Sequence, residues 1–307
     1  MASNPISNTW TLTKIRVRLA MRNRTFLFFS LLMPLGFLFF FVMVFAKHES
    51  QWISYILGAI LTLTVMGSFW GLSVQLVMFR EAGILRRFRL APVGAGPMLA
   101  SSILANYLLV IPSVVIEILV TKWVLHMDSW GNLWAIFLLV TFGSAAFSAF
   151  GLIVASVTNT MQETQVINQI IWTAFLFLSG ATVPLAKFPH WIQGASLFMP
   201  ATYLATGLEF AATNLATFGE ILTDVIALAV GLLVAFEISR QLFRWEPEAK
   251  VPNRAKLWVL AAMIPFIAFG IYENAFGNRL HSVNSNFQML STSENAPASA
   301  PRPSDPH

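Results

Sequence analysis

The sequence predicts an all-α protein that crosses a membrane several times. Hydrophobic residues make up 56% of the 307 residues and charged residues 11%, and the mean hydropathy is +0.68. Soluble domains are roughly 45–50% apolar. Several apolar runs reach the length of about 20 residues that a helix needs to cross a hydrocarbon core of about 30 Å. Because cysteine is absent, a disulfide framework, a thiolate metal site and a cysteine nucleophile are excluded.

Six apolar runs are predicted to form membrane-spanning helices. The first contains Pro34 and follows a segment, 10–24, whose mixture of apolar and basic residues predicts a helix lying in the membrane interface. The six runs are 26–46, 53–79, 98–125, 133–157, 166–183 and 221–243. Together they predict a six-helix transmembrane domain.

The segments after the fifth and sixth runs have a different character. Residues 185–212 are too interrupted by proline to span and too apolar for a solvated loop, so short interfacial or re-entrant helices are expected there. A shorter run, 257–272, contains Pro265 and predicts a seventh helix. From Ser282 onward, serine, asparagine, proline and alanine dominate, which predicts disorder. The expected divisions are an interfacial helix, a six-helix domain, a linker with the seventh helix, and a disordered tail: 1–25, 26–246, 247–280 and 281–307.

The distribution of lysine and arginine predicts the orientation, because basic loops are retained on the cytoplasmic side. If the N-terminus is cytoplasmic, 14 of the 19 basic residues lie on that side. These are Lys14, Arg16, Arg18, Arg22, Arg24, Arg80, Arg86, Arg87, Arg89, Arg240, Arg244, Lys250, Arg254 and Lys256. We therefore expect a multi-pass protein of the plasma (inner) membrane with a cytoplasmic N-terminus. The basic blocks adjoin helix ends, where they meet anionic headgroups, so they indicate contact with membrane lipid and no nucleic-acid partner.

The connection between the second and third runs, REAGILRRFRLAPVG (80–94), concentrates charge in a chain that has little of it. Gly83 stands near its start and a proline near its end, and the residues between them are compatible with a short helix. Ile84, Leu85 and Phe88 would share one face of this helix, with arginines on the others. An apolar knob ringed by charge suits a socket on a protein partner. The alternative is that the arginines only fix the topology and bind lipid.

This connection resembles the first cytoplasmic connection of type-2 ABC exporter permeases, in which glutamate, glycine, a basic and apolar helix and proline follow in this order. A second stretch, SGATVPLAKFPHWIQGASLFMPATYLATGLE (179–209), resembles the external segment of the same family. The residues that carry this likeness are Gly180, Pro184, Pro189, Trp191, Pro200 and Tyr203. The basic N-terminal helix and the proline in the first span also fit, so the resemblance covers about residues 10–246. One departure is Ile84, where the family often has threonine, so a hydroxyl contact is lost there.

The resemblance implies a non-catalytic transport subunit powered by a separate nucleotide-binding ATPase, which binds ATP and Mg²⁺. The sequence itself has no G-x-x-x-x-G-K-[ST] phosphate-binding loop, and no cofactor is expected in this chain. By this resemblance Ile84, Leu85 and Phe88 insert into a groove of the ATPase, with charged side chains around them. The residues expected to couple the two subunits are Arg80, Glu81, Gly83, Ile84, Leu85, Arg86, Arg87 and Phe88. A second permease copy is expected to complete the pathway.

A few small or acidic residues within the spans are candidates for further roles. Gly67 and Gly71 have the G-x-x-x-G spacing that permits close helix packing, in a dimer or within the chain, although chance can also produce it. Glu117 lies inside the third span and is a candidate for the pathway or gate, because an acidic group in lipid is costly. Asp224 is expected to be solvated near the outer end, and Glu237 to pair with a nearby arginine. No G-x-S-x-G or H-E-x-x-H motif is present, so no catalytic or metal site is expected.

We therefore expect an ABC exporter permease that moves an amphipathic drug, lipid or lipid-linked molecule outward. Two alternatives remain open. An ion-coupled secondary transporter would need coupling residues deep in several helices, where Glu117 is nearly alone. A membrane scaffold that transports nothing would have no need of the cytoplasmic knob.

Overall fold

The computed structural model describes residues 5–46, 50–89, 94–215, 217–245 and 257–295, and the regular elements in these ranges are all helical. In chain order they are α1 (Pro5–Arg22), α2 (Arg24–Phe45), α3 (Ser50–Glu81), α4 (Ile84–Arg89), α5 (Ala95–Trp123), α6 (Leu133–Val157), α7 (Met161–Leu178), η1 (Leu185–Lys187), α8 (His190–Ser196), α9 (Pro200–Thr213), α10 (Phe218–Leu242), α11 (Leu257–Ala261), α12 (Ile264–Ala275) and α13 (Arg279–Asn295). The predicted fold class, an all-α polytopic membrane protein, is confirmed.

Among the described residues, 5 helices are long and apolar enough to cross a membrane. They are α2, α3, α5, α6 and α10. The fifth predicted span, 166–183, is not among these five helices. The helix in this region, α7, begins earlier, at Met161, and its first turns are polar. Thr160 caps this helix by accepting the N–H of Glu163 at 3.2 Å. The helix ends before Gly180, whose φ of +98° leaves the helical region.

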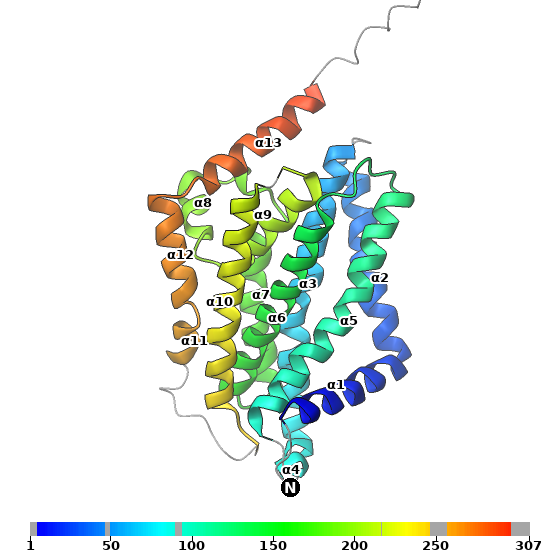
Figure 1. Ribbon diagram of the computed structural model, residues 1–307, viewed down its shortest axis with the longest axis vertical. Coiled ribbons are helices and arrows are strands. Elements are labelled where there is room, and N and C mark those ends of the chain that lie inside the picture. The colour runs from blue at the N-terminus through cyan, green and yellow to red at the C-terminus, as the bar shows by residue number, and fades with distance from the viewer. Residues whose placement is uncertain (1–4, 47–49, 90–93, 216, 246–256, 296–307) are drawn as a thin grey trace, which may run out of the picture.

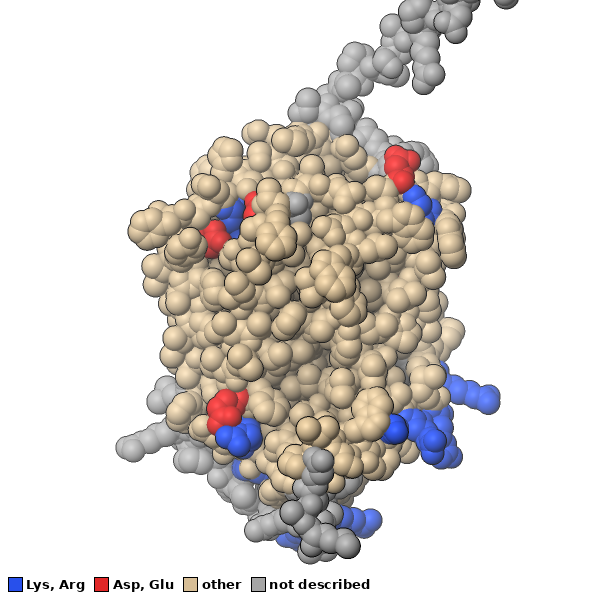
Figure 2. All heavy atoms as spheres, viewed as in Figure 1, with Lys and Arg blue, Asp and Glu red and all other residues tan. Residues whose placement is uncertain are grey.

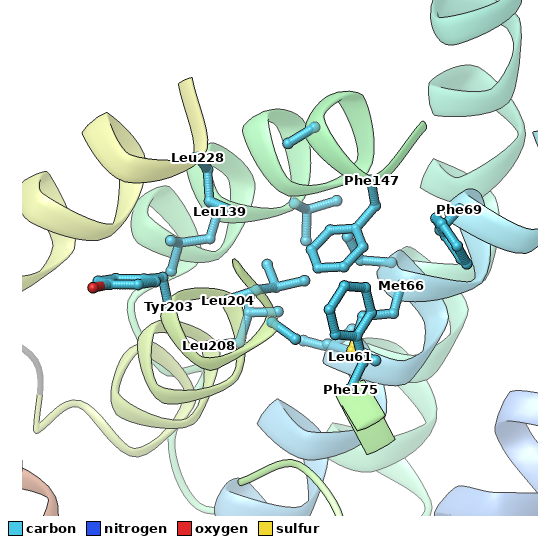
Figure 3. Close-up of a cluster of buried hydrophobic side chains, with 14 of the residues drawn as sticks. Leu61, Met66, Phe69, Leu139, Phe147, Phe175, Tyr203, Leu204, Leu208 and Leu228 are labelled. Carbon is cyan, nitrogen blue, oxygen red and sulfur yellow. The ribbon is translucent and has the colours of Figure 1, made fainter. Parts of the chain in front are cut away.

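The core of the bundle lies between α3 and α6, with α9 and α10 packed beside them (Figure 1). Large apolar side chains from these helices and α7 fill the space between them (Figure 3). Phe147 of α6 meets Phe175 of α7 edge to face, with ring centroids 5.6 Å apart. Gly58 of α3 faces the backbone of Glu209 in α9 so closely that a side chain there would collide. Close backbone approach therefore fixes the position of α9 against α3.

The segment 185–212 forms the short helices that its broken apolar pattern predicts. Each of these begins at a proline: Pro184 precedes η1, Pro189 precedes α8, and Pro200 is the first residue of α9. Proline suits these positions because the first N–H groups of a helix have no partner within it. α9 is buried over nearly its whole length and ends at Thr213, and Asn214, which follows it, has a φ of 60°.

The C-terminal part differs from the prediction in two respects: the seventh helix is interrupted, and part of the predicted disordered tail is helical. The predicted seventh helix, 257–272, is not continuous, because α11 and α12 are separated at Ala262 and Met263, just before Pro265. Pro265 has no N–H to donate to the preceding turn and its ring crowds that turn, so a proline can interrupt a helix, as here, or be accommodated within one, as Pro34 is in α2. In the tail predicted to be disordered from Ser282, the part that the structure describes is helical, because α13 occupies it as far as Asn295.

A narrow apolar stripe stabilises α13. Leu280, Val283, Phe287 and Leu290 recur at spacings of three and four residues, which places them on one face. Val283 and Leu280 pack with residues of η1 and α9, and the ring of Phe287 lies 6.0 Å from that of Trp52 in α3. The polar residues on the other face dominate the composition, and composition was the basis for predicting disorder.

The two ends of the bundle differ in charge. α1 and α4 lie at one end, and α8 and α13 lie at the opposite end (Figure 1). Lysine and arginine gather at the α1 and α4 end of the face drawn in Figure 2, and the middle of that face carries neither. The fold thus brings the basic N-terminal helix and the basic connection to the same end, as the orientation argument requires.

Candidate functional site

The connection between α3 and α5 forms a short helix, as the sequence predicts. α3 ends at Glu81, Ala82 and Gly83 turn the chain, and α4 follows. The N–H of Gly83 donates to the carbonyl of Arg80 at 3.0 Å, and its φ of +68° is a conformation that glycine adopts without strain. The backbone conformation of this turn therefore explains why a glycine occupies position 83.

Arg80 points into the protein. Its side chain is 2% exposed. Nη1 donates to the carbonyl of Ala155 at 2.7 Å and Nη2 to that of Thr158 at 2.7 Å, both at the C-terminal end of α6. Arg244, which follows α10, donates to the same Thr158 carbonyl at 2.6 Å. Two arginines thus satisfy the last carbonyls of α6, where cations are favoured by the helix dipole.

Glu81 connects α3 to a different helix. Its Oε1 accepts the backbone N–H of Met161 at 2.8 Å, at the first turn of α7. A carboxylate at this position satisfies one of the donors that a helix N-terminus leaves unpaired. The polar end of α3 therefore contacts both α6 and α7.

The expectation of an exposed apolar knob is wrong for Leu85. This side chain is 0% exposed and packs with Leu12 of α1, Leu76 of α3 and Met98 of α5. Arg86 is exposed, as is Arg87, and Ile84 is half-buried. The side chain of Phe88 lies outside the described residues. Among the described side chains of α4 the exposed ones are thus basic, and Leu85 packs this helix against three others.

A polar face of α7 was not anticipated from the sequence. Gln162, Gln165, Gln169 and Thr173 are exposed and recur at spacings of three and four residues. On the opposite side Asn168 donates to Ser73 Oγ of α3 at 2.6 Å. Polar groups facing hydrocarbon are costly unless they have partners. This face therefore suits water or a second polypeptide, and the glutamine spacing within 162–173 was the signal that could have revealed it.

Neither Gly67 nor Gly71 packs closely within this chain. A Cβ built at either position would meet nothing within 4 Å. Among the described residues nothing packs closely on these two glycines, and packing against a second copy stays a prediction.

Glu117 is buried and is held by α3. Its side chain is 1% exposed, and Oε1 accepts from Thr64 Oγ1 at 2.8 Å. Lys122 does not reach it, and instead donates to the carbonyls of Met127 and Asp128 at 2.8 and 2.7 Å. A pathway or gating role for Glu117 stays a prediction.

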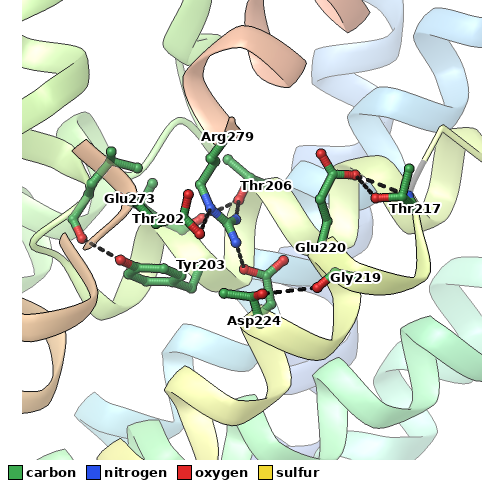
Figure 4. A network of polar contacts seen from close by, with 11 residues as sticks. Thr202, Tyr203, Thr206, Thr217, Gly219, Glu220, Asp224, Glu273 and Arg279 are labelled. Carbon is green, nitrogen blue, oxygen red and sulfur yellow. Dashed lines mark hydrogen bonds and ion pairs between the residues drawn. The ribbon is translucent and has the colours of Figure 1, made fainter. Parts of the chain in front are cut away.

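A cluster of buried charges joins the start of α13 to α9, α10 and α12 (Figure 4). Arg279 Nη2 lies 2.5 Å from Asp224 Oδ1, and its Nε lies 3.7 Å from Glu273 Oε1. The guanidinium also donates to Thr206 Oγ1 at 2.8 Å and lies over the ring of Tyr203, 4.9 Å from its centroid. The expectation that Asp224 is solvated is wrong, because Arg279 in the C-terminal segment neutralises it inside the protein. The expected pair between Glu237 and Arg240 is confirmed at 2.7 Å.

The predicted external residues divide into buried and exposed positions. Tyr203 is buried, and its hydroxyl donates to the carbonyl of Leu197 at 2.8 Å. Trp191 is 75% exposed, as expected for a residue that contacts the membrane surface. Within the described ranges no group of three or more histidine and acidic side chains could hold a metal ion.

Comparisons with known proteins match the membrane core. A family model described as "ABC-2 type transporter" matches residues 7–211. The linearmycin resistance permease protein LnrN of Bacillus subtilis (strain 168) is 25% identical over 174 residues, which are 57% of this chain and 44% of that protein. The putative transport permease YvfS of the same organism is 21% identical over 239 residues, which are 75% of this chain and 94% of that protein. The match thus spans less than half of LnrN and nearly all of YvfS.

Proposed function

The chain belongs to the ABC-2 type transporter family, whose members are membrane subunits of transporters, and on this premise we propose that it is the permease of an ATP-driven exporter whose ATPase is a separate protein. In this proposal the partner binds ATP and Mg²⁺, and this chain catalyses nothing itself. The absence of a G-x-x-x-x-G-K-[ST] loop from the sequence supports that division of labour.

The observation that carries the proposal is the attachment of α4 and the adjoining end of α3 to the rest of the bundle. Its exposed arginines, Arg86 and Arg87, form the contact surface for the ATPase in this proposal. Leu85 is buried beneath them, and Arg80 and Glu81 tie the adjoining end of α3 to α6 and α7. In this proposal a displacement of α4 is transmitted to α3 and, through Arg80 and Glu81, to α6 and α7, because packed and hydrogen-bonded elements move together.

The pathway is proposed to lie between two copies of the chain. The polar face of α7, with Gln165, Gln169 and Thr173, supplies uncharged hydrogen-bonding groups for one wall. Val166 and Ile170 of the same helix are also exposed, and a wall that mixes apolar with uncharged polar groups suits an amphipathic drug, lipid or lipid-linked molecule better than an ion. The name of LnrN, a resistance permease, supports export of a drug-like compound.

The proposed orientation places the N-terminus, α1 and α4 on the cytoplasmic side of the plasma membrane. The gathering of lysine and arginine at that end supports it, because cationic segments are retained in the cytoplasm (Figure 2). The external segment with α8 and α9, together with α13, then faces outward.

The test is capture and stimulation of a candidate ATPase that carries a phosphate-binding loop. The permease is co-expressed with it as wild type, as Arg86→Glu/Arg87→Glu, and as Arg22→Glu, an exposed arginine at the same end outside α4. We expect the double variant to lose co-purification and vanadate-sensitive stimulated turnover, and Arg22→Glu to retain both. Equal capture and stimulation by all three would reduce α4 to a topology determinant. Failure of the wild type to capture or stimulate the ATPase would favour the ion-coupled alternative.

A further inference from the structure

A groove between α1, α3 and α5 contains the guanidinium of Arg16. Its volume is about 360 Å³, within the range of about 300–1,000 Å³ typical of small-molecule sites. Leu19 and Leu109 supply apolar wall, and the amides of Gln75 and Asn106 supply polar groups. No aspartate or glutamate lines the groove. The groove thus combines a cation, amides and apolar surface.

Arg16 has only weak partners in the described part of the chain. Nη1 lies 3.4 Å from Gln75 Oε1, Nη2 lies 3.5 Å from Met98 Sδ, and the guanidinium carbon lies 5.6 Å from the ring centroid of Phe79. None of these groups is an anion. Burial lowers the pKa of Arg16 to about 10, so the side chain stays charged at neutral pH. A desolvated charge is unfavourable until an opposite charge compensates it.

The surroundings of the groove reinforce the positive charge. α1 carries Lys14, Arg18 and Arg22 in addition to Arg16, and it contains no acidic residue. It lies at the end of the bundle where the basic residues gather, across the ends of the long helices (Figure 1). A ligand here meets charge on the α1 side and apolar helices on the other.

The groove stays open because Gly71 has no side chain. A Cβ at Gly71 would meet nothing within 4 Å, so a larger residue enters the groove without displacing a helix. Gly67, one turn earlier on α3, has equally open surroundings but does not line the groove. These two glycines therefore provide a matched pair for testing occupancy.

We propose that this groove is a binding site for an anionic membrane phospholipid, whose phosphate binds Arg16 while its acyl chains lie on the apolar wall. The charge complementarity selects an anionic headgroup, and the apolar wall selects a lipid over a free anion. The site does not depend on the transport function proposed above. It relies on the proposed orientation only for the leaflet, the cytoplasmic one, that supplies the lipid.

The test uses the purified full-length chain, stripped of lipid in neutral detergent and without an ATPase. Phosphatidylglycerol and phosphatidylcholine are titrated separately, and bound lipid is counted by native mass spectrometry alongside the melting temperature. We expect phosphatidylglycerol to bind and to raise the melting temperature. Arg16→Gln is expected to weaken binding by about 10-fold or more, the usual effect of losing a charged hydrogen bond. Arg18→Gln, an exposed arginine on the same helix, should bind as wild type does.

The glycine pair provides a test in which Arg16 is unchanged. Gly71→Leu should weaken phosphatidylglycerol binding, and Gly67→Leu should not. Equal losses in Arg16→Gln and Arg18→Gln would show a diffuse surface charge and overturn the proposal. Binding of phosphatidylcholine as tight as that of phosphatidylglycerol, or equal protection by inorganic phosphate, would overturn it too. Because no ATPase is present, these outcomes are separate from success or failure of the exporter proposal.

Discussion

Arg279 at the start of α13 forms an ion pair with Asp224 in α10, with 2.5 Å between Nη2 and Oδ1, and both side chains are almost completely buried. The same guanidinium donates to Thr206 of α9. One side chain therefore fastens the C-terminal segment to two helices of the core. The family match ends at residue 211, so this fastening joins a segment beyond the match to α9 within it.

We expect Arg279→Met to lower the free energy of unfolding by about 3–5 kcal/mol, because Asp224 would remain as an uncompensated buried charge. Arg279→Met/Asp224→Leu is expected to recover much of that loss, since an apolar pair can replace a buried ion pair. Thermal unfolding in detergent measures both effects. As a control, Arg240→Gln breaks the exposed pair with Glu237 and should leave the melting temperature nearly unchanged. A double variant less stable than Arg279→Met would contradict this account.

Arg80→Met is expected to destabilise the end of the bundle where α4 lies. The carbonyl of Ala155 would lose its charged donor, at about 1–3 kcal/mol for a buried group left unpaired, whereas the carbonyl of Thr158 would keep Arg244 as a donor. The measurement is the melting temperature combined with proteolysis of the connection. Arg87→Met, on the exposed surface of α4, should change neither. If both variants behaved alike, the inward contacts of Arg80 would be unimportant for stability.

Gly58→Ala is expected to destabilise the protein and Gly67→Ala is not, although both positions lie in α3. At Gly58 the new methyl group would press on the backbone of Glu209, and overpacking of this kind costs about 1–3 kcal/mol. At Gly67 the space is empty, so alanine should be neutral or stabilise the helix by up to about 1 kcal/mol. Melting temperatures of the two purified variants decide the matter, and equal changes would argue against the close approach of α3 and α9.

Hydropathy predicted most of the spans because each is an apolar run of sufficient length, which depends on local sequence alone. It failed at α7, where Gln162, Gln165 and Gln169 occupy one face of a helix whose apolar run begins only at residue 166. Window averages discard the direction in which side chains point. The helical period would have separated the two faces.

The sequence predicted where the candidate site lies in the chain. It did not predict which of the side chains in this site point into the protein. The turn at Gly83 and the short helix followed from the local sequence. The burial of Leu85 depends on α1 and α5, and the inward course of Arg80 depends on the end of α6, none of which is adjacent in sequence. The same holds for Asp224, whose partner at 279 lies 55 residues further along the chain.

The stability of the protein is expected to depend on pH because of Glu209 in α9. This side chain is 4% exposed and shares a hydrogen bond with Tyr55. Burial raises the pKa of Glu209 well above its ordinary value, and the bond to Tyr55 offsets this only in part. Above the ordinary pKa of about 4.3, the unfolded chain releases this proton while the folded chain keeps it, so stability falls as the pH rises.

Glu209→Gln keeps the shape and the hydrogen-bonding capacity of the side chain but cannot titrate. The melting temperature of the wild type minus that of Glu209→Gln should therefore decrease as the pH is raised from about 5 towards 8. Asp128→Asn, an exposed position between α5 and α6, controls for general charge and should show no such trend. Parallel curves for wild type and Glu209→Gln would mean that Glu209 ionises in the folded protein as readily as in the unfolded one. Its burial between α3 and α9 would then not exclude water.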